Sequence, residues 1–161
     1  METPEPAAQS VTMQEFHRKI ATELFTGVFT LLDKAERTCA ENDRMIHAAH
    51  ASRYHWDHCG SPVNFAMGEW QCSRVHSALG QSDAAIYHGL RALELAEDHD
   101  LGPFHLGYAH EALARAFAGR DPAKAAHHLQ RAHEIAAEMT DADEKAQLQT
   151  DLEAIRPSGA E

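Results

Sequence analysis

The sequence has no long apolar run and few cysteines. No stretch approaches the roughly 18–20 residues needed to cross a bilayer, so a membrane protein is not expected. Residues 1–10 are acidic and contain two prolines, unlike a secretory signal. The three cysteines, Cys39, Cys59 and Cys72, form no Cys-x-x-Cys pair. This odd, unpaired set argues against a disulfide framework and predicts a cytoplasmic protein in reducing surroundings.

Positive charge is scarce and scattered. Lys and Arg total 14 against 25 Asp and Glu, which gives a formal charge of −11, and no run of basic residues occurs. Surfaces that bind phosphate backbones or anionic lipids need clustered positive charge. Nucleic acids and membrane surfaces are therefore not expected as partners. Nothing in the sequence fixes an oligomeric state.

The alternation of β-branched residues that is typical of strands is also missing, and capping signals divide the chain into helices. Thr12 and Glu15 form a capping box, Ser61-Pro62 starts another helix, and Asp121-Pro122 a third. The expected helices cover about 12–39, 41–58, 61–79, 82–98, 102–119 and 121–139, with a last one from 140. We expect an all-α domain over 12–156, built as an antiparallel helix-hairpin array of about seven helices, with disordered tails at 1–11 and 157–161.

Two of the expected hairpins repeat one another. The segment 91–96 (Arg-Ala-Leu-Glu-Leu-Ala) aligns with 131–136 (Arg-Ala-His-Glu-Ile-Ala), and the turn residue Gly80 aligns with Gly119. A helix pair recurring at this spacing is typical of helical repeat proteins. Together with the small residues Ala85, Gly89 and Ala92, the pattern over roughly 64–139 resembles the tetratricopeptide (TPR) family. The resemblance implies a concave groove that binds a protein or peptide.

The family register places several polar residues where helices usually pack together. In the first unit these positions fall on Glu69, Cys72, Ser73 and His76, and in the second on Tyr108, Glu111, Ala112 and Arg115. Buried charge is costly unless it is paired or bound to a metal. These positions are therefore candidates either for buried ion pairs or for a functional site.

The sequence also has 13 histidines, most of them in helical segments. His47, His50 and His58 lie on one side of their expected helix, with His55 nearby, and His88 lies on the core side of another. Imidazole and carboxylate are ligands for zinc, iron or manganese, and helical bundles commonly assemble such sites from several helices. The predicted metal ligands are His50, His55, Glu69, His88 and Glu111.

A structural interpretation stands beside each of these candidates. Glu69 and Glu111 would form buried salt bridges with arginines, Cys59 and Cys72 would fill the core, and Trp70 and Phe104 would be ordinary core aromatics. His127, His128 and His133 share a charged helix face that is expected to be solvated. Two hypotheses for function follow: a TPR-like interaction module, and a metal-dependent enzyme whose interior His and Glu ligands activate water or oxygen.

Overall fold

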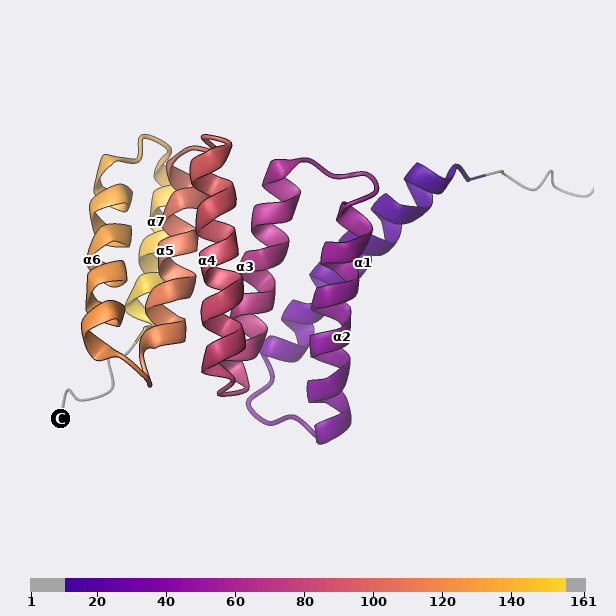
Figure 1. Cartoon of the computed structure of the whole chain (residues 1–161), viewed down its shortest axis with the longest axis horizontal. Coiled ribbons are helices and arrows are strands. Elements are labelled where there is room, and N and C mark those ends of the chain that lie inside the picture. Colours follow the sequence, from indigo (N-terminus) through magenta and orange to yellow (C-terminus); the bar gives the residue numbers. More distant parts are fainter. Residues whose placement is uncertain (1–10, 156–161) are drawn as a thin grey trace, which may run out of the picture.

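The computed structural model describes residues 11–155, and these residues form seven α-helices and no strand (Figure 1). The predicted all-α helix array is therefore confirmed. Of the predicted disordered tails, 1–11 and 157–161, only Val11 lies within the described residues, where it is exposed. The helices are α1 (Met13–Leu32), α2 (Cys39–Trp56), α3 (Pro62–Ala78), α4 (Ser82–Asp98), α5 (Pro103–Phe117), α6 (Pro122–Glu138) and α7 (Ala142–Glu153).

The predicted start of α1 is confirmed, but its predicted end is wrong. Thr12 and Glu15 form the expected capping box, whereas the helix stops at Leu32 instead of continuing to residue 39. A second capping box, between Thr38 and Glu41, starts α2 at Cys39. The Arg37 guanidinium donates to the carbonyls of Leu31 at 3.2 Å and Lys34 at 3.0 Å, so it satisfies groups left free where α1 ends.

The helices lie in two layers. In the first, α1 packs against α3, α3 against α5, and α5 against α7. The even-numbered helices form the second layer, each packed between its two neighbours in the chain. As a result α3 touches α1, α2, α4 and α5, and its different faces point toward different parts of the molecule.

Small residues dominate the interior and allow the helices to approach closely. Ala85, Ala92, Ala112 and Ala132 are at most 2% exposed, and larger side chains such as Leu113 fill the spaces between them. Of the polar residues expected at packing positions, Glu69 and Arg115 are half-buried, and the others are buried: Cys72, Ser73, His76, Tyr108 and Glu111. That part of the prediction is confirmed.

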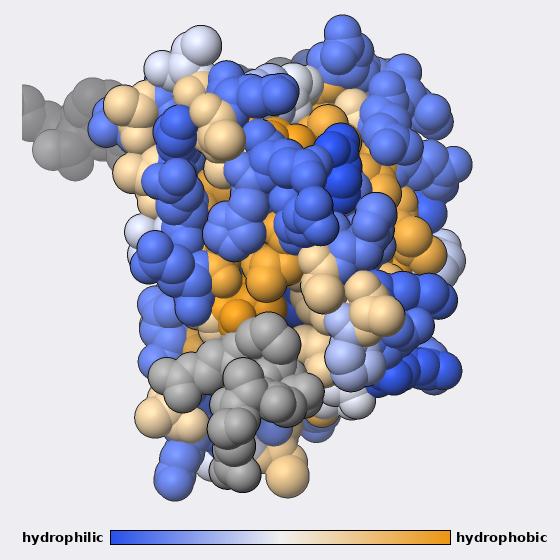
Figure 2. All heavy atoms as spheres, turned by 90° about the vertical axis from the view of Figure 1, so that its left-hand side faces the viewer, coloured by the Kyte–Doolittle hydropathy of each residue, from blue (hydrophilic) through white to orange (hydrophobic). Residues whose placement is uncertain are grey.

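One face of the molecule is mostly polar (Figure 2). On the end of the array where α6 lies, hydrophilic side chains surround a smaller apolar area (Figure 2). Within residues 11–155, no helix combines the length and the apolar character that crossing a membrane requires.

Candidate metal centre

Two glycines allow close helix packing beside the candidate site. A Cβ added to Gly68 of α3 would lie 2.6 Å from a side-chain carbon of α2, and one added to Gly89 of α4 would lie 2.9 Å from a side-chain carbon of α5. Both distances are shorter than ordinary contacts, so a larger residue would push these helices apart. Gly68 precedes Glu69 and Gly89 follows His88, which means that this close packing also positions two residues of the site.

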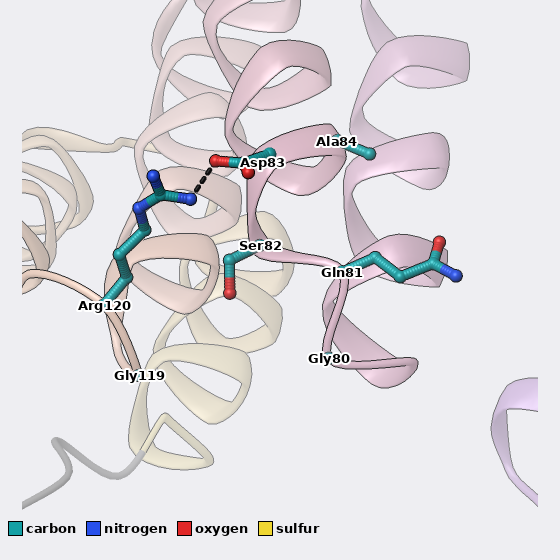
Figure 3. Close-up of a pocket in the computed structure, with 7 residues that line it drawn as sticks. All are labelled: Gly80, Gln81, Ser82, Asp83, Ala84, Gly119 and Arg120. Atoms are coloured by element: carbon teal, nitrogen blue, oxygen red, sulfur yellow. Dashed lines mark hydrogen bonds and ion pairs between the residues drawn. The ribbon is translucent and has the colours of Figure 1, made fainter.

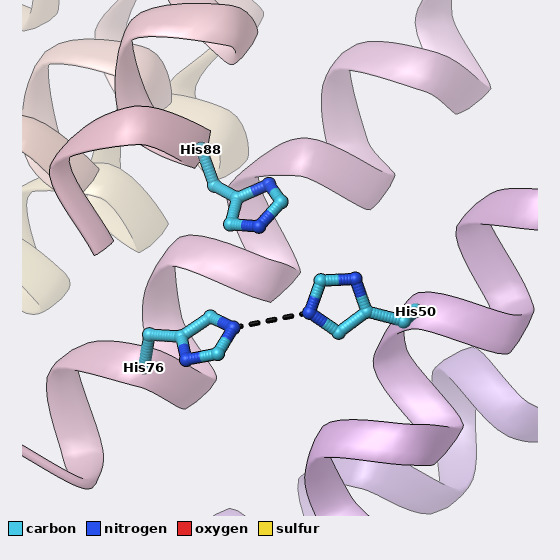
Figure 4. Close-up of side chains that lie close together, drawn as sticks. All are labelled: His50, His76 and His88. Atoms are coloured by element: carbon cyan, nitrogen blue, oxygen red, sulfur yellow. Dashed lines mark hydrogen bonds between the residues drawn. The ribbon is translucent and has the colours of Figure 1, made fainter. Parts of the chain in front are cut away.

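Three histidines from successive helices meet at one point (Figure 4). His50 of α2, His76 of α3 and His88 of α4 each offer one ring nitrogen, and all three nitrogens lie within 4.8 Å of one another. The Nε2 atoms of His50 and His76 are 3.0 Å apart. Ligand nitrogens around a tetrahedral zinc ion are separated by about 3.3 Å. Small side-chain rotations would therefore bring all three to bonding distance of one ion.

A carboxylate fixes the His88 ring from behind. Nδ1 of His88 is 2.7 Å from Oε2 of Glu69, and the other oxygen of Glu69 accepts a hydrogen bond from Nε of Arg53 at 3.0 Å. The side chains of His88 and Glu69 are only 14% and 13% exposed, so the pair is shielded from solvent. In the neutral ring, Nδ1–H of His88 donates to the carboxylate and Nε2 has the free lone pair. Carboxylate–histidine pairs of this kind commonly support metal ligands.

An amide fixes His76 in a similar way. Its Nδ1 lies 2.6 Å from Oε1 of Gln81, an acceptor, so Nδ1 carries the proton and Nε2 has the lone pair. His50 then donates its own Nε2–H to Nε2 of His76. A metal ion between the two rings would take the place of that proton, which would move to Nδ1 of the same ring, so that His50 stays neutral. The hydrogen bond between the two rings thus holds both nitrogens near the position of an ion.

The protonation states of these groups favour metal binding. Burial lowers the pKa of His50 and of His76, and the neighbouring His88 acts in the same direction on both, while Gln81 opposes the shift at His76. At Glu69 burial acts to raise the pKa, but the hydrogen bonds and charges of His88 and Arg53 outweigh it, so the pKa lies below its usual value. Neutral imidazoles beside an ionised carboxylate are the forms that a bound metal requires.

No protein-family model, curated protein or solved structure matches the chain. Only the geometry of this chain's own side chains therefore indicates what the site can bind. Among residues 11–155, His50, His76 and His88 form the one group of three or more His, Cys, Asp or Glu whose ligand atoms converge closely enough to hold a metal ion. Three neutral nitrogens would leave at least one coordination position open, as in zinc sites that also bind water.

The predicted ligand Glu111 lies elsewhere. It is fully buried in α5, where it accepts hydrogen bonds from Nε1 of Trp70 at 2.9 Å and from Nη2 of Arg115 at 2.6 Å. Arg74 approaches the same carboxylate at 3.6 Å. This arrangement matches the salt-bridge interpretation of Glu111, and its oxygens do not join the three histidines.

The predicted ligand His55 belongs to another histidine cluster, at the C-terminal end of α2. Its Nδ1 is 2.9 Å from Nδ1 of His17 in α1, and the His17 ring stacks on that of His58 with centroids 4.2 Å apart. Burial lowers the pKa of His17, and the charges of His58 and His55 add to that effect. Of the five predicted ligands, the structure thus brings together His50 and His88, with Glu69 behind them.

His76 is not among the five predicted ligands, although its position in the sequence carries a signal. It follows Glu69 by seven residues, which places both on one face of α3, and it occupies a buried position. Cys72, on the same side, is fully buried, and burial together with the Glu69 charge raises the pKa of its thiol to about 12. A neutral thiol in that position fills the core, as the structural interpretation had it.

A surface pocket with different chemistry lies at the turn between α3 and α4 (Figure 3). It occupies about 630 Å³ between the α3–α4 turn and Gly119-Arg120. Its charged residues are Asp83 and Arg120, which pair with each other while remaining largely exposed. Such a solvated pair contributes little binding energy. The pocket meets the metal centre only at Gln81, which lines the pocket and holds the His76 ring.

Proposed function

We propose that this chain is a metal-binding helical-array protein in which His50, His76 and His88 hold one divalent ion. The observation that carries the proposal is the convergence of three imidazole nitrogens together with the hydrogen bonds made behind two of the rings. Isolated histidine pairs are common in helical proteins, but hydrogen-bond acceptors behind the rings that leave each lone pair facing one point are typical of metal sites.

Zinc is the preferred ion, with iron second. Three imidazoles are neutral, intermediate-softness ligands that suit zinc, iron, copper and nickel, whereas manganese prefers carboxylate and water oxygens. Of the three metals that the composition favours, manganese is therefore the least suited to this ligand set. Glu69 contributes charge from behind His88 and offsets part of the charge of the cation.

The scaffold supports an interaction module. Two stacked hairpins with matching turn glycines underlie the resemblance to tetratricopeptide repeats, and in such a scaffold a protein or peptide would bind along the layer of odd-numbered helices. The metal ion would then stabilise the contact between α2, α3 and α4 and hold the array in one shape. Because binding to the folded state alone stabilises it, metal should raise the melting temperature.

The open coordination position favours a second candidate, a metal-dependent enzyme. A water molecule on a zinc ion held by three histidines has a pKa near 7 and can act as a nucleophile. Small anions distinguish the two candidates. Azide or thiocyanate should perturb the absorption spectrum of a cobalt-substituted site if a position is open and reachable, and leave it unchanged if the site is closed and structural.

Titration of metal-free protein with zinc and cobalt tests the proposal. We expect one equivalent to bind, a higher melting temperature, and the intense visible absorption of four-coordinate cobalt. The His50→Ala variant should lose all three effects, and His47→Ala, one turn away on the same helix, should keep them. Binding that survives in His50→Ala, or that is absent in the unmodified chain, contradicts the proposal.

A further inference from the structure

An aromatic cavity lies on a different face of α3 from the histidines. It has a volume of about 330 Å³ and is bordered by α1, α3, α5 and α7, the layer of odd-numbered helices. Trp70 and Arg74 line it, whereas Glu69 and His76 belong to the metal centre. At 3.6 residues per turn these two pairs of positions are separated by roughly a third of a turn, so one helix supplies two distinct sites.

The walls of this cavity are unusually rich in aromatic rings. The ring of Trp70 meets that of Phe29 with centroids 6.1 Å apart and that of Tyr108 at 5.5 Å and 81°, and Tyr108 in turn meets Phe104 at 4.9 Å. Hydrogen bonds fix two of the rings, because Trp70 donates to Glu111 at 2.9 Å and Tyr108 donates to Asp151 at 2.7 Å. The aromatic cavity is thus lined by rings from α1, α3 and α5 at several inclinations, two of them held in place.

Two carboxylates border the same cavity. Asp33 lies at the end of α1 and Asp151 on α7, and within residues 11–155 neither has a Lys, Arg or His side chain within ion-pair distance. The one basic residue in the lining, Arg74, is 3.6 Å from the buried carboxylate of Glu111, which also pairs with Arg115. The three carboxylates Asp33, Asp151 and Glu111 still outnumber the two guanidinium groups. The unmatched charge at the cavity is therefore negative, in a chain whose formal charge is −11.

The rings of this cavity also differ from other aromatic rings of the chain in what lies over them. Trp56, Phe65 and Phe117 each have a guanidinium or ammonium group of the protein above the ring, at 4.7–5.9 Å from the centroid. Among the described residues, no such internal cation is recorded over Phe29, Trp70, Phe104 or Tyr108. Within the described residues, no protein cation therefore takes the place that a ligand cation would occupy over these rings.

We infer that the aromatic cavity binds an alkylated ammonium group, with the rings of Phe29, Trp70 and Tyr108 around the cation and Asp33 and Asp151 balancing its charge. Aromatic rings attract quaternary ammonium groups through their negative faces, and the attraction grows when water is excluded. A volume of about 330 Å³ is at the small end of the range for ligand sites, which fits a compact group. The site shares no residue with the metal centre.

Three probes of the same shape but different charge test this inference: choline, its neutral isostere 3,3-dimethylbutan-1-ol, and the anion 3,3-dimethylbutanoate. The chain has two tryptophans, so nitrogen-labelled protein gives two indole N–H signals in a two-dimensional NMR spectrum. Choline should shift the Trp70 signal and leave that of Trp56 unchanged. We expect choline to bind about tenfold more tightly than the neutral isostere, since the difference is the cation–π attraction. Equal affinity, or tighter binding of the anion, overturns the inference.

Two pairs of matched variants locate the site. Phe29→Ala and Asp33→Asn should each weaken choline binding several-fold. Their controls, Phe16→Ala on the same helix and Asp43→Asn on α2, should not change it. Unchanged binding in both cavity variants also overturns the inference. Protein treated with a chelator should bind choline as before, so the result is independent of the metal proposal.

A further binding experiment distinguishes two sources of the ammonium group. A short peptide carrying one trimethyllysine should bind at least tenfold more tightly than choline if the ammonium belongs to a protein partner lying along the odd-numbered helices. Affinity equal to or below that of choline identifies a free small cation as the ligand. An unmethylated, acetylated lysine in the same peptide removes the cation and should abolish the Trp70 shift in either case.

Discussion

His88 and His128 occupy matching positions in the two repeated hairpins, forty residues apart, but their surroundings differ. Both are half-buried, and both have Nδ1 within hydrogen-bond distance of a partner: Glu69 at 2.7 Å for His88, and Nδ1 of His110 at 2.9 Å for His128. The carboxylate leaves Nε2 of His88 facing two further imidazoles. The ring of His128 instead stacks on Phe117, at an interplanar angle of 2°.

The comparison shows that the partner behind a histidine, more than its position in the repeat, determines what it can do. Glu69 holds a metal-competent tautomer of His88. Between α5 and α6, burial lowers the pKa of His110 to about 4, with the charges of His128 and Arg131 contributing, so this pair is a packed, neutral contact. The first hairpin is therefore expected to respond to metal and the second to acid.

The largest expected difference between the two hairpins is in metal affinity. Replacing His88 with alanine removes one of three protein ligands. Structural zinc sites with four ligands bind with about 10–16 kcal/mol, so the loss should be about 3–4 kcal/mol, roughly 150- to 900-fold. His128→Ala should leave zinc affinity unchanged. Competition with a chromophoric chelator measures both, with circular dichroism as a check on folding. Equal losses in the two variants would contradict the assignment.

A smaller loss is expected when only the partner behind His88 changes. In Glu69→Gln the amide no longer supplies a negative charge, and zinc affinity should fall about 10–100-fold, the usual range for such partners. Glu94→Gln, an exposed carboxylate on α4 that pairs with Arg91, is the matched control and should have no effect. If Glu69→Gln binds zinc as tightly as the unmodified chain, the carboxylate does not tune the site.

The His110–His128 pair should respond to acid instead. The pKa of His110 is about 4 in the folded chain and about 6.5 when unfolded, so protons bind preferentially to the unfolded state. The stability contributed by neutral His110 is complete above about pH 6.5 and is lost as the pH falls toward 4. Between pH 7 and pH 5 this loss is about 2 kcal/mol in the free energy of unfolding. Urea denaturation at both pH values should show it, and should show a clearly smaller loss in His110→Leu.

The smallest effect concerns the glycine beside His88. The residue forty positions after Gly89 is Leu129, so the two hairpins differ in how closely the even-numbered helix packs. Gly89→Ala should destabilise the fold by about 1 kcal/mol, because its Cβ would meet Leu113 at 2.9 Å. Gly27→Ala in α1, where nothing lies within 4 Å, should stabilise by about 0.5–1 kcal/mol. Thermal melts decide the sign of each change.

The sequence predicted the fold well because its helix ends are marked by local chemistry. Capping residues such as Thr12, Ser61 and Asp121 act within one turn, so they can be recognised without knowing the tertiary structure. The predicted end of α1 is wrong because the apolar spacing continues past Leu32. The Thr38–Glu41 capping box, which starts the next helix, is the local signal that marks the boundary. The resemblance to tetratricopeptide repeats stays a prediction.

The candidate site was predicted only in part, and the reason is geometric. Helical spacing tells which face of a helix a side chain occupies, but not which neighbouring helix that face meets. His50, His88 and Glu69 were identified from their faces and do lie together. Glu111 was identified in the same way, yet its face of α5 meets Trp70 and Arg74 of α3. The metal that these residues would bind, and the partner of the array, stay predictions as well.

The metal content of the untagged protein tests the central claim most directly. The chain would be produced in medium containing zinc and iron, purified without a nickel column or chelator, and analysed by mass spectrometry of its elements after gel filtration. The account predicts close to one zinc or iron ion per chain, and none in His88→Ala prepared in the same way. A metal-free chain that also fails to retain zinc after incubation with one equivalent would contradict it.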